Sequence, residues 1–395
     1  MRAAAILVLV IPLVYRVFRW DDAGSEKNRA GGEGGEIMEF GVLFTSHPNI
    51  EAEPYPHRDV HARVTRQTVR ADELGYDYAW VAEHHFSNEY GIMPDVFVYA
   101  AYLAALTKRI KIGTAVVTLP LANPLRVVEN TAFVDILSNG RFALGLGSGY
   151  RKYEFDGFGA DFDRRRDVQE EALPLLMELF HNKRVDHHGD NFSFKVDGGY
   201  EIFPHALQEP HPPIFLAGAT DRSIGVAAKM GFGLFLSSWT PFAELARQTA
   251  NYHKHLGETP EAMRGNPARG HVDIARWVYV AESDAKARRE SEPVIMRSLA
   301  HFSSGHTSGY LGTVSQDVGA KPRDYDALTR DIILHGSPAT VVAKIEELQA
   351  MAGNSSIMLH FPPWYGAEKA LASLELFASE IMPKFRERPR VQKRA

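Results

Sequence analysis

The chain has 395 residues, of which 45% are hydrophobic, and a formal net charge of -5 at pH 7. This composition can fill the core of one large domain or of two to three ordinary ones. No long run of Lys and Arg occurs before the extreme C-terminus, which argues against nucleic acid as a partner. Zero cysteines exclude disulfides, thiolate metal sites and a cysteine nucleophile. A reducing compartment suits this composition, and we expect a cytoplasmic protein.

The first 37 residues differ from everything that follows. The apolar run at residues 3–14 is shorter than the roughly 20 residues that a membrane span needs, so we expect no stable membrane anchor. A linker rich in Gly and charged residues follows at 21–36. We interpret residues 1–37 as an extension that is disordered or that precedes a natural start at Met38. N-terminal sequencing of the native protein tests this interpretation.

From residue 40 onward, short apolar strands alternate with amphipathic helices. Residues 183–210 interrupt the alternation and have room for a short hairpin. The long Gly-, Ser- and Asp-containing stretch at 303–334 is interpreted as an insertion or lid. The predicted strands are 40–44, 78–82, 110–117, 141–146, 213–217, 233–236, 272–280 and 356–361, and the predicted helices are 59–74, 95–106, 124–137, 164–180, 221–230, 241–256, 284–302, 338–351 and 367–385.

About eight strand–helix units predict a single α/β domain over residues 38–395, a (β/α)₈ TIM barrel with a late insertion at about 303–334. A doubly wound open sheet is the alternative. The barrel is favoured because both halves of the chain keep the same short rhythm. In addition, no dinucleotide-binding fingerprint follows the first strand.

Two adjacent histidines follow the second predicted strand, next to Glu83. Strand ends on one rim are where barrel enzymes keep their sites. His84 is therefore a candidate proton donor, acceptor or hydrogen-bond orienter, and His85 a candidate for the same task from the other face. A solvated surface turn is the alternative. We expect no metal site, because adjacent side chains on an extended segment point apart and no regular His spacing accompanies them.

Two glycine-rich segments also lie at predicted strand ends. Residues 145–149 let the backbone approach a ligand closely. Residues 218–223 open a helix, so the N–H groups of its first turn are candidates for holding a phosphate. Each segment alone could be an ordinary turn, but together they suggest a phosphorylated cofactor across the barrel mouth. The candidates in the second segment are Gly218, Ala219, Thr220 and Ser223.

Several motifs, taken together, resemble those of the bacterial luciferase-like flavin monooxygenases. They occur in the same order and at the same spacing, and the resemblance extends over residues 38–385. The matching segments are 40–41, Ala-Glu-His-His-Phe at 82–86, 112–116, Leu-Pro-Leu-Ala-Asn-Pro-Leu-Arg at 119–126, Leu-Ser-Asn-Gly-Arg at 137–141, 145–149 and Ile-Met-Pro at 381–383.

This resemblance implies a (β/α)₈ barrel that uses reduced FMN, supplied by a separate reductase, and molecular oxygen to oxidise a small apolar organic substrate. It also implies a homodimer formed through the helices after the early strands. Two alternatives stay open, namely a deazaflavin-dependent hydride-transfer enzyme on the same fold and a flavin-binding protein without catalytic activity.

By position, the resemblance implies roles for individual residues. His84 matches the catalytic histidine of the family, with His85 in a supporting place. Ala115 and Val116 match the segment against the flavin ring, which is often joined by a non-proline cis peptide bond. Asn123 is a further candidate on the cofactor side.

The chain departs from the luciferase α-subunit at two positions in the first glycine-rich segment. Ser148 stands where that subunit has an arginine on the flavin phosphate, and Gly147 stands where it has a reactive cysteine. These departures argue against luciferase activity. They shift the expected phosphate binding to Tyr150 and to the helix start at 218–223.

Overall fold

A computed structural model describes residues 37–88, 90–302 and 323–386. The predicted extension at 1–37 therefore lies outside the described residues except for its last position. Within the described ranges, no helix is both long enough and apolar enough to cross a membrane.

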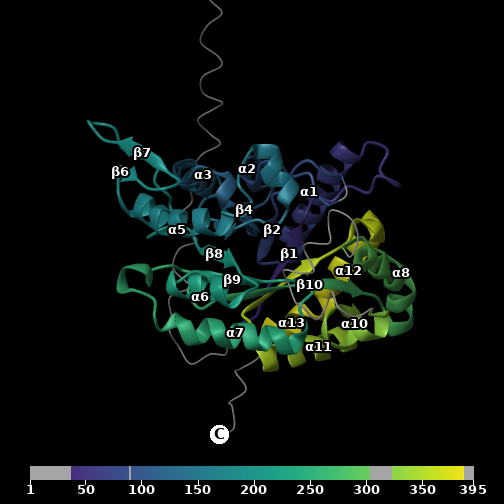
Figure 1. Ribbon diagram of the computed structural model, residues 1–395. Coiled ribbons are helices and arrows are strands. Elements are labelled where there is room, and N and C mark those ends of the chain that lie inside the picture. Colours follow the sequence, from purple (N-terminus) through teal and green to yellow (C-terminus); the bar gives the residue numbers. More distant parts are fainter. Residues whose placement is uncertain (1–36, 89, 303–322, 387–395) are drawn as a thin grey trace, which may run out of the picture. The chain divides into compact units, whose positions relative to one another are not determined.

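Eight parallel strands form a closed barrel (Figure 1). Each strand pairs with the next one named below. The ring closes because Glu39 at the start of the first strand pairs with Ser356 at the start of the last. This closure confirms the predicted (β/α)₈ barrel and excludes the open sheet. In ring order the strands are β1 (Glu39–Phe44), β2 (Tyr78–Val81), β3 (Lys111–Thr114), β5 (Phe142–Gly147), β8 (Ile214–Ala217), β9 (Gly233–Leu236), β10 (Val272–Val280) and β12 (Ser356–His360).

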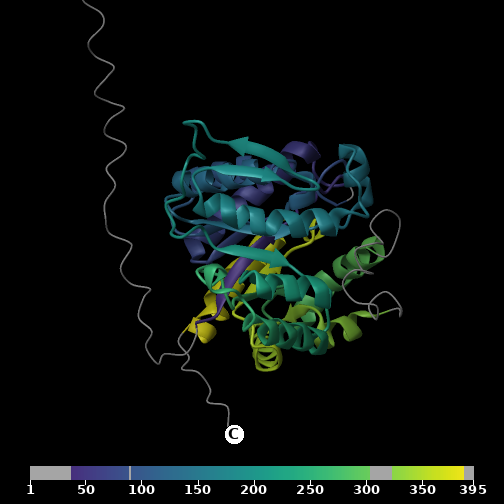
Figure 2. The ribbon, with the colours of Figure 1, turned by 60° about the vertical axis from the view of Figure 1, so that its left-hand side comes forward.

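Helices surround the strands on the outside (Figures 1 and 2). Several begin at a polar side chain that accepts hydrogen bonds from the first-turn N–H groups, as Asp95 does for α2 and Ser337 for α11. The helices are α1 (Pro56–Leu74), α2 (Val96–Leu106), α3 (Pro124–Leu137), α4 (Lys152–Phe158), α5 (Arg165–His181), α6 (Asp221–Lys229), α7 (Phe242–Leu256), α8 (Asp284–Phe302), α10 (Tyr325–Asp331), α11 (Pro338–Ala352), α12 (Ala367–Glu380) and α13 (Met382–Arg386).

The predicted hairpin within 183–210 is present as β6 (Val185–His188) and β7 (Ser193–Val196), which pair antiparallel beside α5 (Figure 2). Two elements that were predicted as continuous are each split into two shorter ones in the structure. The third strand ends at Thr114, and β4 (Val117–Thr118) resumes after it and pairs with β5. The last helix breaks at Ile381, because Pro383 has no N–H to continue the helical hydrogen bonds.

Only part of the predicted insertion at 303–334 lies within the described residues. Residues 303–322 lie outside the described ranges. The remainder differs from a structureless loop, since it contains α10 and reaches β11 (Leu334–Gly336), which pairs with the second half of β10. Strand β10 is nine residues long. Its length lets it belong to the barrel at one end and carry β11 at the other.

Large aromatic side chains fill the middle of the barrel. Trp80 packs edge-to-face against Phe215 and Phe235, with ring centroids 5.3 and 4.9 Å apart. Glycines on the two neighbouring strands make room for Trp80. A Cβ atom at Gly113 would come within 2.1 Å of the indole, and one at Gly41 within 2.9 Å. These side chains fill the barrel at this level and form a floor beneath its carboxyl end.

A buried carboxyl group, Asp273, lies inside the barrel at the start of β10. Its register partner is Ser356. Burial raises the pKa of Asp273 to about 8, and repulsion from Glu39 adds to this, while the polar groups of Ser356 and Trp80 beside the carboxyl oppose it. The carboxyl is therefore protonated in the folded protein at neutral pH.

We predict that Asp273 makes the fold less stable as pH rises. The folded protein holds this proton with a pKa of about 8, against about 3.9 in the unfolded chain, so stability falls between these two values. Between pH 6 and pH 8, ionisation of Asp273 should lower the free energy of unfolding of the wild type by about 2 to 3 kcal/mol. Asp273→Asn should not show this decrease. Urea unfolding at several pH values measures it. The control is Asp156→Asn at an exposed position; equal slopes in wild type and Asp273→Asn would contradict the prediction.

Candidate active site

A cavity lies above this floor, at the carboxyl ends of the barrel strands, and has a volume of about 240 Å³. This is more than ten times the roughly 15 Å³ that one water needs, so the cavity has room for a ligand and is larger than a packing void. Its lining comes from opposite sides of the ring. The pair β5–β8 and the pair β12–β1 are separated by two strands in either direction. A ligand that fills the cavity therefore spans the barrel mouth.

On the β5–β8 side, the lining is rich in glycine and hydrogen-bond donors. Ser148 and Gly218 line the cavity, as the sequence predicts. Close backbone approach is required at Gly147, where a Cβ atom would lie 2.6 Å from the Val116 side chain. Gln169, on α5, also lines this side, and its buried amide nitrogen has no hydrogen-bond partner among the described residues. A buried donor without a partner indicates a bound acceptor.

The start of α6 differs from the prediction of free N–H groups. Ser223 Oγ accepts from the N–H groups of Ala219 at 3.2 Å and Thr220 at 3.1 Å, and Thr220 Oγ1 accepts from the N–H of Ser223 at 3.3 Å. This capping box fixes the helix start and leaves fewer N–H groups for an anion. All three residues nevertheless line the cavity.

Cationic side chains are also confined to this side. Arg165, Arg166 and Arg222 are the arginines in the lining. Arg222 is paired with Glu170 at 2.7 Å. Arg166 makes no ion pair with any residue that the structure describes, so its charge is available to an anionic group.

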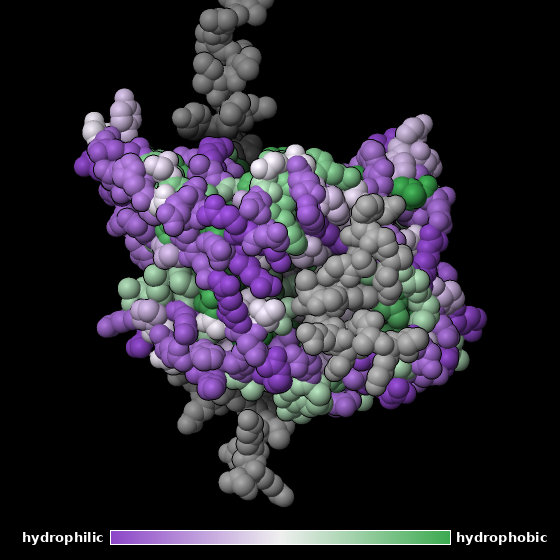
Figure 3. All heavy atoms as spheres, in the orientation of Figure 1, coloured by the Kyte–Doolittle hydropathy of each residue, from purple (hydrophilic) through white to green (hydrophobic). Residues whose placement is uncertain are grey.

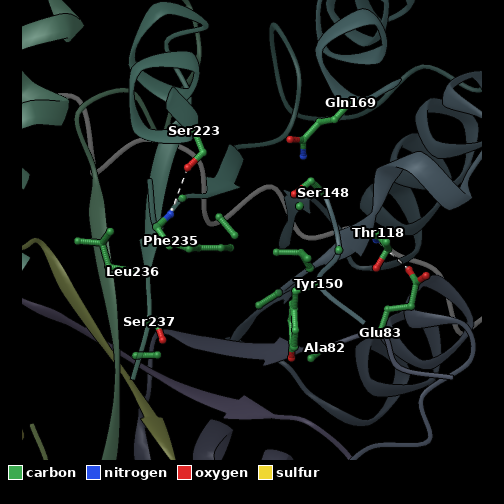
Figure 4. A pocket seen from close by; sticks show the side chains of 18 of the residues that line it. Ala82, Glu83, Thr118, Ser148, Tyr150, Gln169, Ser223, Phe235, Leu236 and Ser237 are labelled. Carbon is green, nitrogen blue, oxygen red and sulfur yellow. Dashed lines mark hydrogen bonds between the residues drawn. The ribbon is translucent and has the colours of Figure 1, made fainter. Parts of the chain in front are cut away.

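The middle of the cavity is formed by the break between β3 and β4. Ala115 and Val116 line it, and the peptide bond between them is cis, as the resemblance implies. Tyr150, another predicted residue, also lines it. Figure 4 shows Gln169 and Ser148 toward one end of the site and Ser237 and Ala82 toward the other.

His84 lines the cavity next to β2 and is tied to a buried carboxylate on α4. Its Nδ1 lies 3.1 Å from Glu154 Oε1, and the same oxygen accepts the backbone N–H of His85 at 3.0 Å. The Tyr90 ring packs edge-on against the imidazole at 4.4 Å between centroids. These contacts fix the ring, and Nε2 makes no hydrogen bond to the described residues.

Burial lowers the pKa of His84 below its usual value, although the hydrogen bond that its ring donates to Glu154 opposes this. Burial also acts to raise the pKa of Glu154, but the hydrogen bonds from His84 and from the His85 N–H outweigh it and lower that pKa. The lowered pKa of His84 and the lowered pKa of Glu154 both fit a neutral imidazole that donates its Nδ1–H to an ionised carboxylate. Nε2 is then unprotonated and can accept a proton.

Two predicted residues do not reach the cavity lining. The His85 ring turns away and lies 3.0 Å from Glu83 Oε1, because neighbouring side chains on extended backbone point to opposite faces. Asn123 caps α3 by accepting the N–H of Leu125 at 2.9 Å, so its side chain is committed to the helix start. His84 is the only one of the two adjacent histidines that faces the cavity.

Three large aromatic residues in or beside the barrel strands do not line the cavity. Trp80 is in the barrel floor and Trp239 is fully buried, whereas Phe86 is 63% exposed. The residues that sequence reasoning missed are Glu154, Gln169 and Tyr90. The first two lie on helices, and no local pattern separates a helix residue that faces the mouth from one that faces solvent.

Comparison with known proteins agrees with this geometry. A sequence profile for luciferase-like monooxygenases matches residues 38–355. The chain belongs to the luciferase-like monooxygenase family. Family membership makes it an oxygen-incorporating oxidoreductase and confirms the resemblance noted in the sequence. One relative is the uncharacterized protein y4vJ of Sinorhizobium fredii, 37% identical over 327 residues, which are 80% of this chain and 89% of the relative.

Two further comparisons concern named enzymes. The oxygenase component of the flavin-dependent trigonelline monooxygenase of Acinetobacter baylyi is 26% identical over 325 residues, 80% of this chain and 88% of that protein. The oxygenating constituent of 3,6-diketocamphane monooxygenase from Pseudomonas putida has the same fold. Its structure superposes with a TM-score of 0.71 at 22% identity, covering 90% of this chain and all of that one.

We predict that Glu154 sets the protonation of His84. The hydrogen bond and charge of Glu154 raise the His84 pKa against burial, so Glu154→Gln should lower it further. NMR titration of the labelled imidazole measures this shift. Glu83→Gln is the matched control, because Glu83 is the weakest of the named influences. A larger shift in the control than in Glu154→Gln would refute the assignment.

Proposed function

We propose that this protein is an FMN-dependent monooxygenase that receives reduced FMN from a separate reductase and uses molecular oxygen to oxidise a small, mainly apolar organic molecule. The observation that carries the proposal is the cavity itself. It joins a side rich in glycine and arginine to His84 across the barrel mouth, with the cis peptide between them. A phosphorylated ring cofactor needs both of these sides.

The FMN phosphate would lie on the β5–β8 side, held by Gln169, Arg166 and the hydroxyl of Ser148. The Pseudomonas putida structure is in complex with FMN, which supports this choice of cofactor. The ring system would lie over Ala115 and Val116. Bound reduced FMN supplies the electrons that activate oxygen.

The protein's own residues would position and protect this chemistry. His84 would accept or return a proton at Nε2, with its ring held by Glu154 at Nδ1. The aromatic floor and the apolar wall of Leu43, Phe235 and Met358 would exclude water from the reacting centre. The Acinetobacter baylyi relative is named an oxygenase component, which supports a separate reductase as the source of electrons.

Turnover with a choice of reduced cofactor tests the proposal. Reduced FMN with labelled oxygen should transfer the label to product in a screen of long-chain aldehydes, alkanes and cyclic ketones. His84→Ala should lower kcat by about 10²- to 10⁴-fold and leave FMN affinity nearly unchanged. His188→Ala, on the exposed hairpin, is the control. Turnover only with reduced deazaflavin would support hydride transfer instead, and flavin binding without any product would support a non-catalytic protein.

A second prediction tests the orientation of the cofactor. If Gln169 donates to the phosphate, Gln169→Leu should weaken FMN binding by roughly tenfold and leave riboflavin binding nearly unchanged, since riboflavin lacks the phosphate. Flavin fluorescence measures both dissociation constants. Equal weakening for the two flavins would place the phosphate elsewhere.

We also propose a homodimer through α2 and α3. Val98, Tyr102 and Leu106 recur every fourth residue and so form one stripe on α2, and Phe133 and Leu137 continue it on α3. All five are between 43% and 68% exposed. The space-filling view shows apolar atoms between polar ones along the edge where these helices lie (Figure 3). An apolar stripe of this kind on neighbouring helices is typical of a protein interface.

We predict that a charge in this stripe separates the subunits. Phe133→Glu should shift the protein from dimer to monomer in light-scattering chromatography, because burying an unpaired carboxylate opposes association. Met351→Glu, at an exposed apolar position on α11, should leave the mass unchanged. An unchanged mass in Phe133→Glu would exclude α3 from the contact.

A further inference from the structure

The side of the cavity opposite the arginines carries a pair of polar side chains with no role so far. His360 ends β12 and Thr45 follows β1, and both line the cavity. His360 Nε2 lies 3.4 Å from Thr45 Oγ1, a contact at the long limit of a hydrogen bond. The imidazole is 5% exposed and stacks on Trp277, with centroids 3.9 Å apart and planes at 17°. The ring is therefore held in place on one face.

The two ring nitrogens of His360 differ in their surroundings. Nδ1 is buried and has no hydrogen-bond partner within the described part of the chain. A buried N–H without an acceptor costs more than a buried lone pair without a donor. The proton therefore belongs on Nε2, the nitrogen near Thr45. Nε2–H is then a donor shared between Thr45 Oγ1, at the long distance of 3.4 Å, and a ligand, while the Thr45 hydroxyl is a second donor at the edge of the cavity.

This side of the cavity offers donors but no cation. Burial, together with repulsion from His84, lowers the pKa of His360 to about 3, so the imidazole is neutral near pH 7. The arginines of the lining all come from α5 and α6, across the ring. Arg63 and Arg297, nearby, are paired with Glu53 and Glu51 respectively. Arg151 lies behind Tyr90, with its guanidinium 4.2 Å from the ring centroid, and is outside the lining.

The strands of this side present apolar side chains, and Leu43, Ala275 and Met358 line it. Ser237 and Ser238 after β9 and His84 after β2 border it. Between these borders, a ligand would meet apolar wall and the two donors. A carbonyl oxygen can accept from both donors at once, whereas a sulfonate or carboxylate would lose its hydration without gaining a counter-charge.

We propose that His360 and Thr45 are specificity-determining residues that bind the carbonyl oxygen of an uncharged, mainly apolar substrate. The inference rests on the proposed function, because it takes the opposite side of the cavity to be filled by FMN. In this arrangement the substrate carbonyl is held on the β12–β1 side, across the cofactor ring from the phosphate. An alkane lacks the acceptor, and an alkanesulfonate carries a charge that this side does not match.

Equilibrium binding to the FMN-loaded protein tests the inference with three ligands of equal chain length: 2-octanone, n-octane and octane-1-sulfonate. Wild type should prefer the ketone. Thr45→Val and His360→Leu should each weaken ketone binding about fivefold to tenfold and leave n-octane binding nearly unchanged. His360→Gln keeps an N–H donor and should recover part of the loss. FMN affinity, measured on each variant, should equal that of wild type and shows that the site is intact.

Each outcome separates the two proposals. If wild type binds octane-1-sulfonate as tightly as 2-octanone, or if Thr45→Val weakens ketone and alkane equally, the carbonyl site is refuted while the proposed function stands. Failure of wild type to bind FMN at all refutes the proposed function instead. Steady-state kinetics add a check, since loss of substrate binding should appear mainly in KM.

Discussion

The packing of Trp80 against two glycines determines where chemistry is possible in this barrel. The indole occupies space that a Cβ atom at Gly113 or Gly41 would need, and Phe215 and Phe235 close the remaining section. Below this layer lie buried polar groups such as Asp273, which are sealed from solvent. Above it, the strand ends diverge and leave the cavity. A larger residue at either glycine would displace the floor and with it the whole site.

Charged side chains are distributed unevenly around the mouth of the closed barrel. The cations of the lining stand on α5 and α6, beside the glycine-rich segments after β5 and β8. The histidines stand on the other side, where burial keeps His84 and His360 neutral. Desolvation therefore acts differently on the two sides. It leaves the arginines charged because they are partly open to solvent, and it makes the imidazoles hydrogen-bonding groups rather than counter-ions.

The sequence allowed the ring of strands, the hairpin and most strand-end residues to be predicted, because short apolar strands and helix caps are local signals. His84, Ser148 and Gly218 were found because all strand ends share one rim. Asn123 shows the limit of that reasoning, since an Asn before Pro124 serves equally as a helix cap and as a ligand group. Glu154 and Gln169 depend on how α4 and α5 turn toward the mouth, and that is set by tertiary packing.

The position of Glu154 connects the two sides of the cavity. The turn after β5 contains Gly149, at φ +74°, where a Cβ atom would also meet the Phe155 ring at 2.7 Å. This turn lines the cavity and leads directly into α4, which carries Glu154. One oxygen of Glu154 then holds both the His84 ring and the backbone of His85. The segment that would contact the cofactor phosphate and the residue that orients His84 thus belong to one short stretch of chain, so their spacing is fixed by a single turn.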